Sequence, residues 1–299
     1  MPEPPASVWL IAFGAGLMLA SLATWVYLAY RRRQQHAILA YEPRRPVPWG
    51  PIGALLAILL ALNSVVSAIL SPATAPTIVP NSPLPTTSAP QPIPEQPDVT
   101  TRMASMIVLY PMIVGSVVFI IAIYSKATLH DLGLPIYVGE FARDVGIGVV
   151  ACLAALLPVY GVLSAIELVF REPAHHPIVD AVLREANPVV LLLAAVSAVI
   201  VAPICEEITF RLLLQGWLEK RMTNEEQMAI WLPISVSSVL FALAHAGQGS
   251  APVALFFLAM ILGYLYQRTH RIIPCIAMHA MFNLLTIVGL MLRMMGPVE

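Results

Sequence analysis

Two adjacent glutamates and an arginine interrupt a long apolar segment of the chain. Glu206, Glu207 and Arg211 fall in the run from Pro188 to Trp217, which is otherwise largely hydrophobic. A charged side chain at the centre of a bilayer costs about 2.5–3.5 kcal/mol on insertion scales. Three such side chains within six residues therefore indicate a functional site.

The spacing of these residues predicts one ion pair and one unpaired carboxylate. Glu207 and Arg211 are four residues apart, so they share a helical face and can form an ion pair. Glu206 projects about 100° away from Glu207 and is left without a cation. Such a carboxylate is suited to general acid–base chemistry. In the alternative interpretation both glutamates are structural, and Arg211 neutralises them.

Two later apolar segments carry further polar groups. His245 stands alone in a hydrophobic stretch, where a lone histidine is more often a core residue. His279 and Asn283 are four residues apart, which places an imidazole and a carboxamide on one helical face. Together they can stabilise a developing oxyanion. The simpler interpretation is a hydrogen bond between packed membrane helices.

In this order, the three motifs resemble those of the CPBP family. That family contains the type II CAAX prenyl proteases and bacterial relatives described as bacteriocin-processing or abortive-infection proteins. The motifs are Glu206-Glu207-Ile-Thr-Phe-Arg211, Phe241-Ala-Leu-Ala-His245 and His279-Ala-Met-Phe-Asn283. The resemblance covers about residues 125–290.

The resemblance implies an intramembrane endopeptidase in which a glutamate activates water. On this analogy Glu206 takes a proton from the water, and His245 shares the same water. His279 and Asn283 form the oxyanion hole. The expected substrate is a peptide or protein in or at the membrane.

The resemblance also implies that Glu207 and Arg211 hold the helix and balance its charge. We expect the site to need neither a metal nor another cofactor. Zinc is the main alternative, because two histidines and a glutamate form a catalytic zinc set with an open position for water. The chain contains no His-Glu-x-x-His motif, which weakens that alternative.

Composition places the chain in a membrane. Of its 299 residues, 59% are hydrophobic and only 11% are charged, against about 25% in a typical soluble domain. Long unbroken apolar runs favour helices over a β-barrel. The chain shows no basic patch, so nucleic acid is not an expected partner. We expect an integral protein of a bacterial inner membrane, with the lipid bilayer as its surroundings.

About eight spans are predicted, which gives an all-α polytopic transmembrane bundle. The predicted spans are residues 8–30, 49–70, 103–124, 145–169, 188–219, 228–246, 252–268 and 272–294. The distribution of Lys and Arg favours both termini outside. Residues 1–70 would form an appended transmembrane hairpin, 71–102 a proline-rich outer loop, and 103–299 the CPBP-like protease core.

Other kinds of protein are compatible with the same polar residues. A catalytically silent membrane scaffold or immunity protein would use them only for packing. A transporter would use the carboxylates for proton coupling, but the chain shows no interrupted helices in matching halves. Cys275 lies one turn before His279, and a thiol protease built on it is a weaker option.

Helix lengths raise one difficulty for the shared water. At 1.5 Å per residue, Glu206 lies about 27 Å from Pro188 and hence towards the inner side. His245 lies about 25 Å from Met228, which would place it too far outward. If the span that carries His245 begins only at Pro233, the depths of His245 and Glu206 agree. A separation above about 10 Å would exclude the shared-water role.

Overall fold

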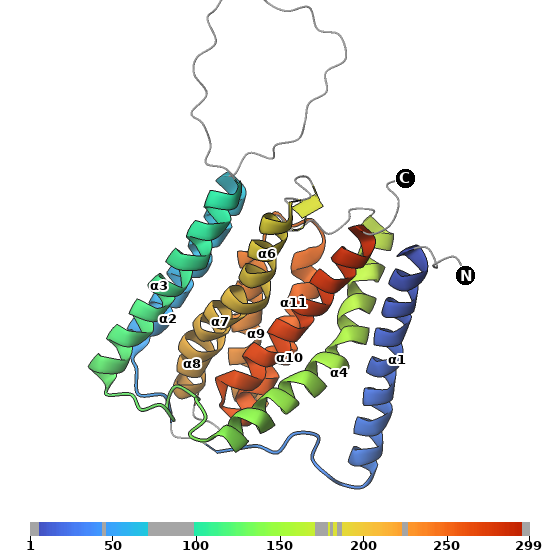
Figure 1. The fold of residues 1–299 in the computed structure, drawn as a ribbon. Helices are drawn as coiled ribbons and strands as arrows, with labels where there is room; N and C mark the ends of the chain where they lie inside the picture. Colours follow the sequence, from blue (N-terminus) through green and yellow to red (C-terminus); the bar gives the residue numbers. More distant parts are fainter. Residues whose placement is uncertain are drawn as a thin grey trace, which may run out of the picture.

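The computed structural model describes residues 6–43, 46–70, 99–170, 187–222 and 227–294, with residues 179, 182 and 183. Among these residues every regular element is a helix, and the helices form one bundle (Figure 1). The helices outside the fifth predicted span are α1 (Ala6–Arg33), α2 (Pro51–Leu70), α3 (Val99–Ser125), α4 (Val138–Phe170), α9 (Gln227–Ala244), α10 (Ala251–Thr269) and α11 (Ile272–Met294).

The fifth predicted span is one helical run that alternates between α and π geometry. Asn187 caps its start by accepting the Val189 N–H at 2.8 Å. Turns of π-helix inside α-helices occur frequently at functional sites. Here two of them bracket the adjacent glutamates. In order, the segments are α6 (Pro188–Val196), η1 (Ser197–Val201), α7 (Ala202–Glu207), η2 (Ile208–Gln215) and α8 (Gly216–Arg221).

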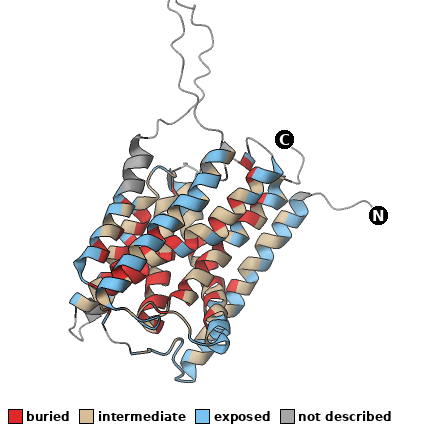
Figure 2. Cartoon of the chain, turned by 60° about the vertical axis from the view of Figure 1, so that its left-hand side comes forward, coloured by how far each residue is buried: buried red, intermediate tan, exposed pale blue. Residues whose placement is uncertain are grey.

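The helices have the length and composition of membrane spans. Six helical segments of the described chain are long and apolar enough to cross a bilayer, and two shorter apolar helices lie within α2 and α9. Each of these eight segments overlaps one predicted span, and the all-α polytopic bundle is confirmed. Buried residues line the interior, while exposed apolar side chains cover much of the outside, as a lipid-facing surface requires (Figure 2).

The two N-terminal helices pack on different parts of the bundle. Figure 1 shows α1 and α2 on opposite sides of the bundle. α1 packs on α4 and α11, whereas α2 packs on α3, α9 and η2. The Trp25 indole donates to the Ala154 carbonyl at 2.9 Å, which fixes α1 to α4. The connection between the two helices is long enough to cross one end of the bundle, so each helix finds its own apolar face.

The proline-rich loop lies outside the described residues over 71–98. The division of the chain into a hairpin region, a loop and a protease core therefore stays a prediction. What the structure adds is that α1 and α2 each pack against helices of the predicted core.

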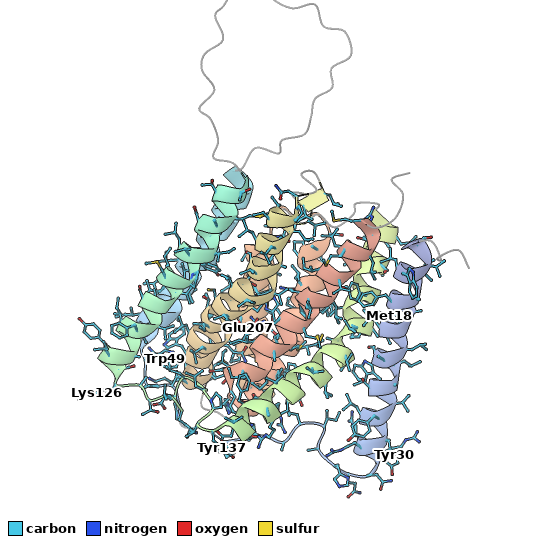
Figure 3. All side chains as sticks on the ribbon, viewed as in Figure 1. Met18, Tyr30, Trp49, Lys126, Tyr137 and Glu207 are labelled. Carbon is cyan, nitrogen blue, oxygen red and sulfur yellow. The ribbon has the colours of Figure 1, made fainter. Side chains whose placement is uncertain are left out.

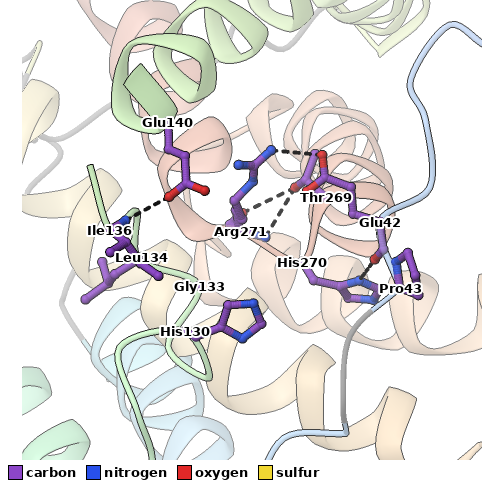
Figure 4. A pocket seen from close by; sticks show the side chains of 10 residues that line it. All are labelled: Glu42, Pro43, His130, Gly133, Leu134, Ile136, Glu140, Thr269, His270 and Arg271. Carbon is purple, nitrogen blue, oxygen red and sulfur yellow. Dashed lines mark hydrogen bonds and ion pairs between the residues drawn. The ribbon is translucent and has the colours of Figure 1, made fainter. Parts of the chain in front are cut away.

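The connection between α1 and α2 is fixed to the turn between α10 and α11. Arg268 donates two hydrogen bonds to a carbonyl of this connection, at 2.9 and 3.2 Å. His270 Nδ1 donates to the Glu42 carbonyl at 2.6 Å. Arg271 binds the Glu42 carboxylate at 3.0 Å and Asp144 of α4 at 3.2 Å. Glu42, His270 and Arg271 line a cavity of about 100 Å³ at this end of the bundle (Figure 4).

Gly148 allows α4 to approach α11 closely. A Cβ atom at this position would lie 2.6 Å from the Pro274 carbonyl oxygen, 2.7 Å from Ala277 Cβ and 2.9 Å from the Met278 nitrogen. Small residues at such crossings are the usual means by which membrane helices associate. The contact matters for the site because α11 carries His279.

We expect Gly148→Ala to destabilise the bundle by about 1–3 kcal/mol, because the added methyl group meets backbone atoms. Gly146→Ala is the matched control, since a Cβ there has no neighbour within 4 Å. Thermal unfolding in detergent micelles measures both. Equal melting temperatures for the two variants would contradict the close-approach argument.

Candidate active site

Three helical segments place the predicted polar residues around one carboxylate. Glu206 lies at the end of α7, His279 lies on α11, and His245 is the first residue after α9. The Glu206 Oε2 atom is 4.0 Å from His245 Nε2 and 3.9 Å from His279 Nε2. The Glu206 and His245 side chains keep 16% and 17% of their surface exposed. The separation is well inside the 10 Å limit, so a water shared by these groups is geometrically possible.

The helix that leads to His245 begins before Pro233. α9 is helical from Gln227 and contains Pro233 in its interior. Glu206 precedes the end of α8 by 15 residues, about 22 Å, and His245 follows the start of α9 by 18 residues, about 27 Å. Measured from their common connection, the two residues lie at similar depth. The fifth helical run is longer than one bilayer crossing. The distance of Glu206 from Pro188 therefore does not by itself give the depth of Glu206 in the membrane.

Glu207 makes two contacts from the interior of the bundle (Figure 3). Its Oε2 atom is 3.2 Å from Arg211 Nε, and both side chains are 0% exposed. This is the ion pair predicted from their spacing. Its Oε1 atom accepts a hydrogen bond from His279 Nδ1 at 2.9 Å. The second contact was not predicted, because spacing along one helix carries no information about a partner on another.

Hydrogen-bond partners fix which nitrogen of each histidine faces Glu206. His245 Nδ1 is 2.8 Å from the Phe241 carbonyl, which can only accept, so Nδ1 carries a hydrogen. His279 Nδ1 donates to Glu207 for the same reason. In a neutral imidazole the other nitrogen is then an acceptor. In the neutral form of each ring, Nε2 therefore faces the Glu206 carboxylate with a lone pair.

The Glu206 carboxylate and the two Nε2 atoms are three acceptors around one gap. They need a proton donor or a cation between them. The separations of 3.9 and 4.0 Å are too long for direct hydrogen bonds and suit a bridging water. Because one water donates only two hydrogens, an added proton completes the set. The donor types would also suit zinc, but ligand atoms around a tetrahedral zinc lie about 3.3 Å apart. Among the described residues, no group of three or more His, Cys, Asp or Glu has metal-binding geometry.

Asn283 reaches the same region from one turn beyond His279. Its Nδ2 atom donates to the Ala198 carbonyl of η1 at 2.7 Å. A carboxamide has two hydrogens, so this bond leaves one for another acceptor. The structure thus brings Asn283 to the helical turns that precede Glu206.

Phe241, the first residue of the Phe-x-x-x-His motif, packs beneath the site. Its ring centroid is 4.8 Å from that of His245 and 5.9 Å from that of His279. The Arg211 guanidinium lies 5.0 Å from the same centroid. One fully buried ring therefore contacts both histidines and the buried cation.

Tyr110 of α3 is a neighbour of the site that the sequence did not reveal. Its hydroxyl lies near the Thr209 side chain, and it interacts electrostatically with Glu206. Thr209 in turn donates to the Cys205 carbonyl at 2.7 Å. The only available signal was a tyrosine followed by Pro111 within an apolar run. Its approach to Glu206 is a tertiary contact between α3 and α7.

Comparison with known proteins agrees with the motifs. Residues 188–285, about a third of the chain, match the family described as type II CAAX prenyl endopeptidase Rce1-like. The matched segment contains all three motifs, and it confirms the resemblance drawn from them. No curated protein and no solved structure matches the chain.

We expect Arg211→Met to destabilise the protein by about 3–5 kcal/mol, because the Glu207 carboxylate then stays buried without its cation. The double variant Glu207→Gln, Arg211→Met should recover much of that loss, since neither charge remains. Unfolding of the Arg211→Met variant and of the double variant in detergent, compared with Glu207→Gln alone, gives the coupling free energy between Glu207 and Arg211. Strictly additive effects would show that the pair is not the interaction that holds this region.

Proposed function

We propose that this chain, whose residues 188–285 match the CAAX-type endopeptidase family, is an intramembrane endopeptidase that hydrolyses peptide bonds of membrane-associated substrates. The observation that carries the proposal is the convergence of Glu206, His245 and His279. Their reactive atoms come from three helical segments and surround one gap at 3.9–4.0 Å.

Glu206 acts as the general base. A water in the gap gives its proton to the Glu206 carboxylate as its oxygen attacks the scissile carbonyl carbon. The His245 Nε2 lone pair accepts the other hydrogen of this water and thereby aims its oxygen. The proton on Glu206 then passes to the leaving amine as the carbon–nitrogen bond breaks. The products are a carboxylic acid and an amine, and no external reagent besides water is consumed.

His279 and Asn283 stabilise the tetrahedral oxyanion. Because His279 Nδ1–H is held by Glu207, Nε2 can donate only when the ring carries a second proton. The Glu207 carboxylate stabilises that imidazolium. Asn283 supplies its second amide hydrogen. Donors aimed at a developing negative charge act strongly in a water-poor cavity.

Glu207 and Arg211 serve the site indirectly in this mechanism. Arg211 balances the charge of the buried Glu207 carboxylate, and Glu207 orients the His279 ring. The partners in this proposal are a peptide or protein substrate in or at the bilayer and the lipid itself, with no nucleic acid. The protein is an integral membrane protein by its helices, and we place it in a bacterial inner membrane.

Glu206→Gln should lower kcat by about 10²–10⁴-fold without unfolding the protein, because an amide cannot take the proton. Glu140→Gln is the control, as Glu140 caps the Ile136 N–H away from the gap. A panel of labelled peptides in nanodiscs provides the assay. A fully active Glu206→Gln would exclude the general-base role. A wild type that cleaves no peptide would instead favour a silent scaffold or immunity protein.

Catalysis should survive removal of metal, because the proposed base and donors are all side chains of the chain. The measurement is peptide cleavage after treatment with EDTA and phenanthroline, in a sample whose zinc content is determined. Full loss of activity, with recovery when zinc is added back, would establish the zinc-dependent alternative.

A further inference from the structure

Each polar group around the gap has an acceptor that orients it. Glu207 holds His279 and the Phe241 carbonyl holds His245. For Asn283 the acceptor is the Ala198 carbonyl at 2.7 Å. The first two acceptors are ordinary, since one is a carboxylate and the other is a carbonyl near a helix end. The third is unusual, because Ala198 lies inside a helical run whose carbonyls normally bond to backbone N–H groups.

The reason the Ala198 carbonyl is available lies five residues further along the chain. In η1 the hydrogen bonds run from residue i to residue i−5, as shown by the Ala202 N–H bonded to the Ser197 carbonyl. In that register the donor to the Ala198 carbonyl would be residue 203. Residue 203 is a proline, which has no N–H. The carbonyl would stay without a helical partner, and Ala198 is only 8% exposed.

We propose that Pro203 is a positioning residue of the active site, since by withholding a backbone N–H it reserves the Ala198 carbonyl for the Asn283 amide. The proposal rests on the function proposed above, in which the second amide hydrogen of Asn283 faces the oxyanion. The bond fixes the plane of the carboxamide and thus the direction of that hydrogen. It also ties α11 to the helical turn that leads into Glu206.

The alternative is that Asn283 acts on the substrate alone and that its bond to the Ala198 carbonyl is incidental. The two cases differ in how Asn283 and Pro203 depend on each other. If the amide replaces the missing N–H, then supplying an N–H at position 203 removes the need for the amide in folding. If the bond is incidental, the two positions act independently.

A set of stability measurements separates these cases without any assay of activity. Asn283→Leu should lower the melting temperature in detergent by roughly 5 °C, because a buried carbonyl loses its donor. Adding Pro203→Ala should restore most of this loss. Adding Pro158→Ala, which removes a comparable proline from the interior of α4, should not. No recovery with Pro203→Ala, or equal recovery with Pro158→Ala, would overturn the proposal.

Kinetics then test the positioning role. Pro203→Ala alone should lower kcat about tenfold with KM unchanged, because the amide is free to turn away from the reacting carbonyl. Pro158→Ala should keep the wild-type kcat. Wild-type kcat in Pro203→Ala would overturn the positioning role even if stability is restored as expected. If the wild type cleaves no peptide, the proposed function fails, and the stability measurements still decide whether Asn283 replaces the proline N–H.

Discussion

The buried ion pair between Glu207 and Arg211 is the interaction on which the rest of the site depends. Both side chains are withdrawn completely from solvent, where a charge without a partner is costly. Arg211 also donates to the Ala259 carbonyl of α10 at 3.3 Å, and Glu207 accepts from His279 of α11. The pair therefore joins three helices. Moving any one of them would expose a charge to an apolar interior, so the position of His279 is tightly constrained.

Neighbouring helices stabilise the π-helical turns around this pair. The Phe210 carbonyl of η2 accepts from Ser237 of α9 at 2.8 Å. Gln215, at the end of η2, donates to the Gly263 carbonyl of α10 at 2.8 Å. With Asn283 on the Ala198 carbonyl, side-chain hydrogen bonds join this run to α9, α10 and α11. In a membrane, where water cannot satisfy freed backbone groups, such side-chain bonds allow a π-helical run to persist.

The contacts at the turn between α10 and α11 act on α11 from its start. Arg271 stands between Glu42 and the fully buried Asp144, immediately before α11 begins. The connection after α1, which lies outside the matched segment 188–285, is thus part of what fixes α11. Gly148 adds a close contact further along the same helix. The site on α7 is in this way supported by parts of the chain that carry no catalytic group.

The sequence by itself determined the helical membrane class, the three motifs, and the pairing of Glu207 with Arg211. Long apolar runs and i, i+4 spacing are local properties, so they can be read without knowing how helices pack. Only the tertiary structure decided that Glu207 binds His279, that Tyr110 borders Glu206, and that α1 and α2 lie on opposite sides of the bundle. These are contacts between distant segments, which depend on helix depth and rotation rather than on spacing. The depth of His245 shows most clearly what spacing cannot predict. It depends on the lengths of two helices, the fifth run and α9, measured from the connection between them.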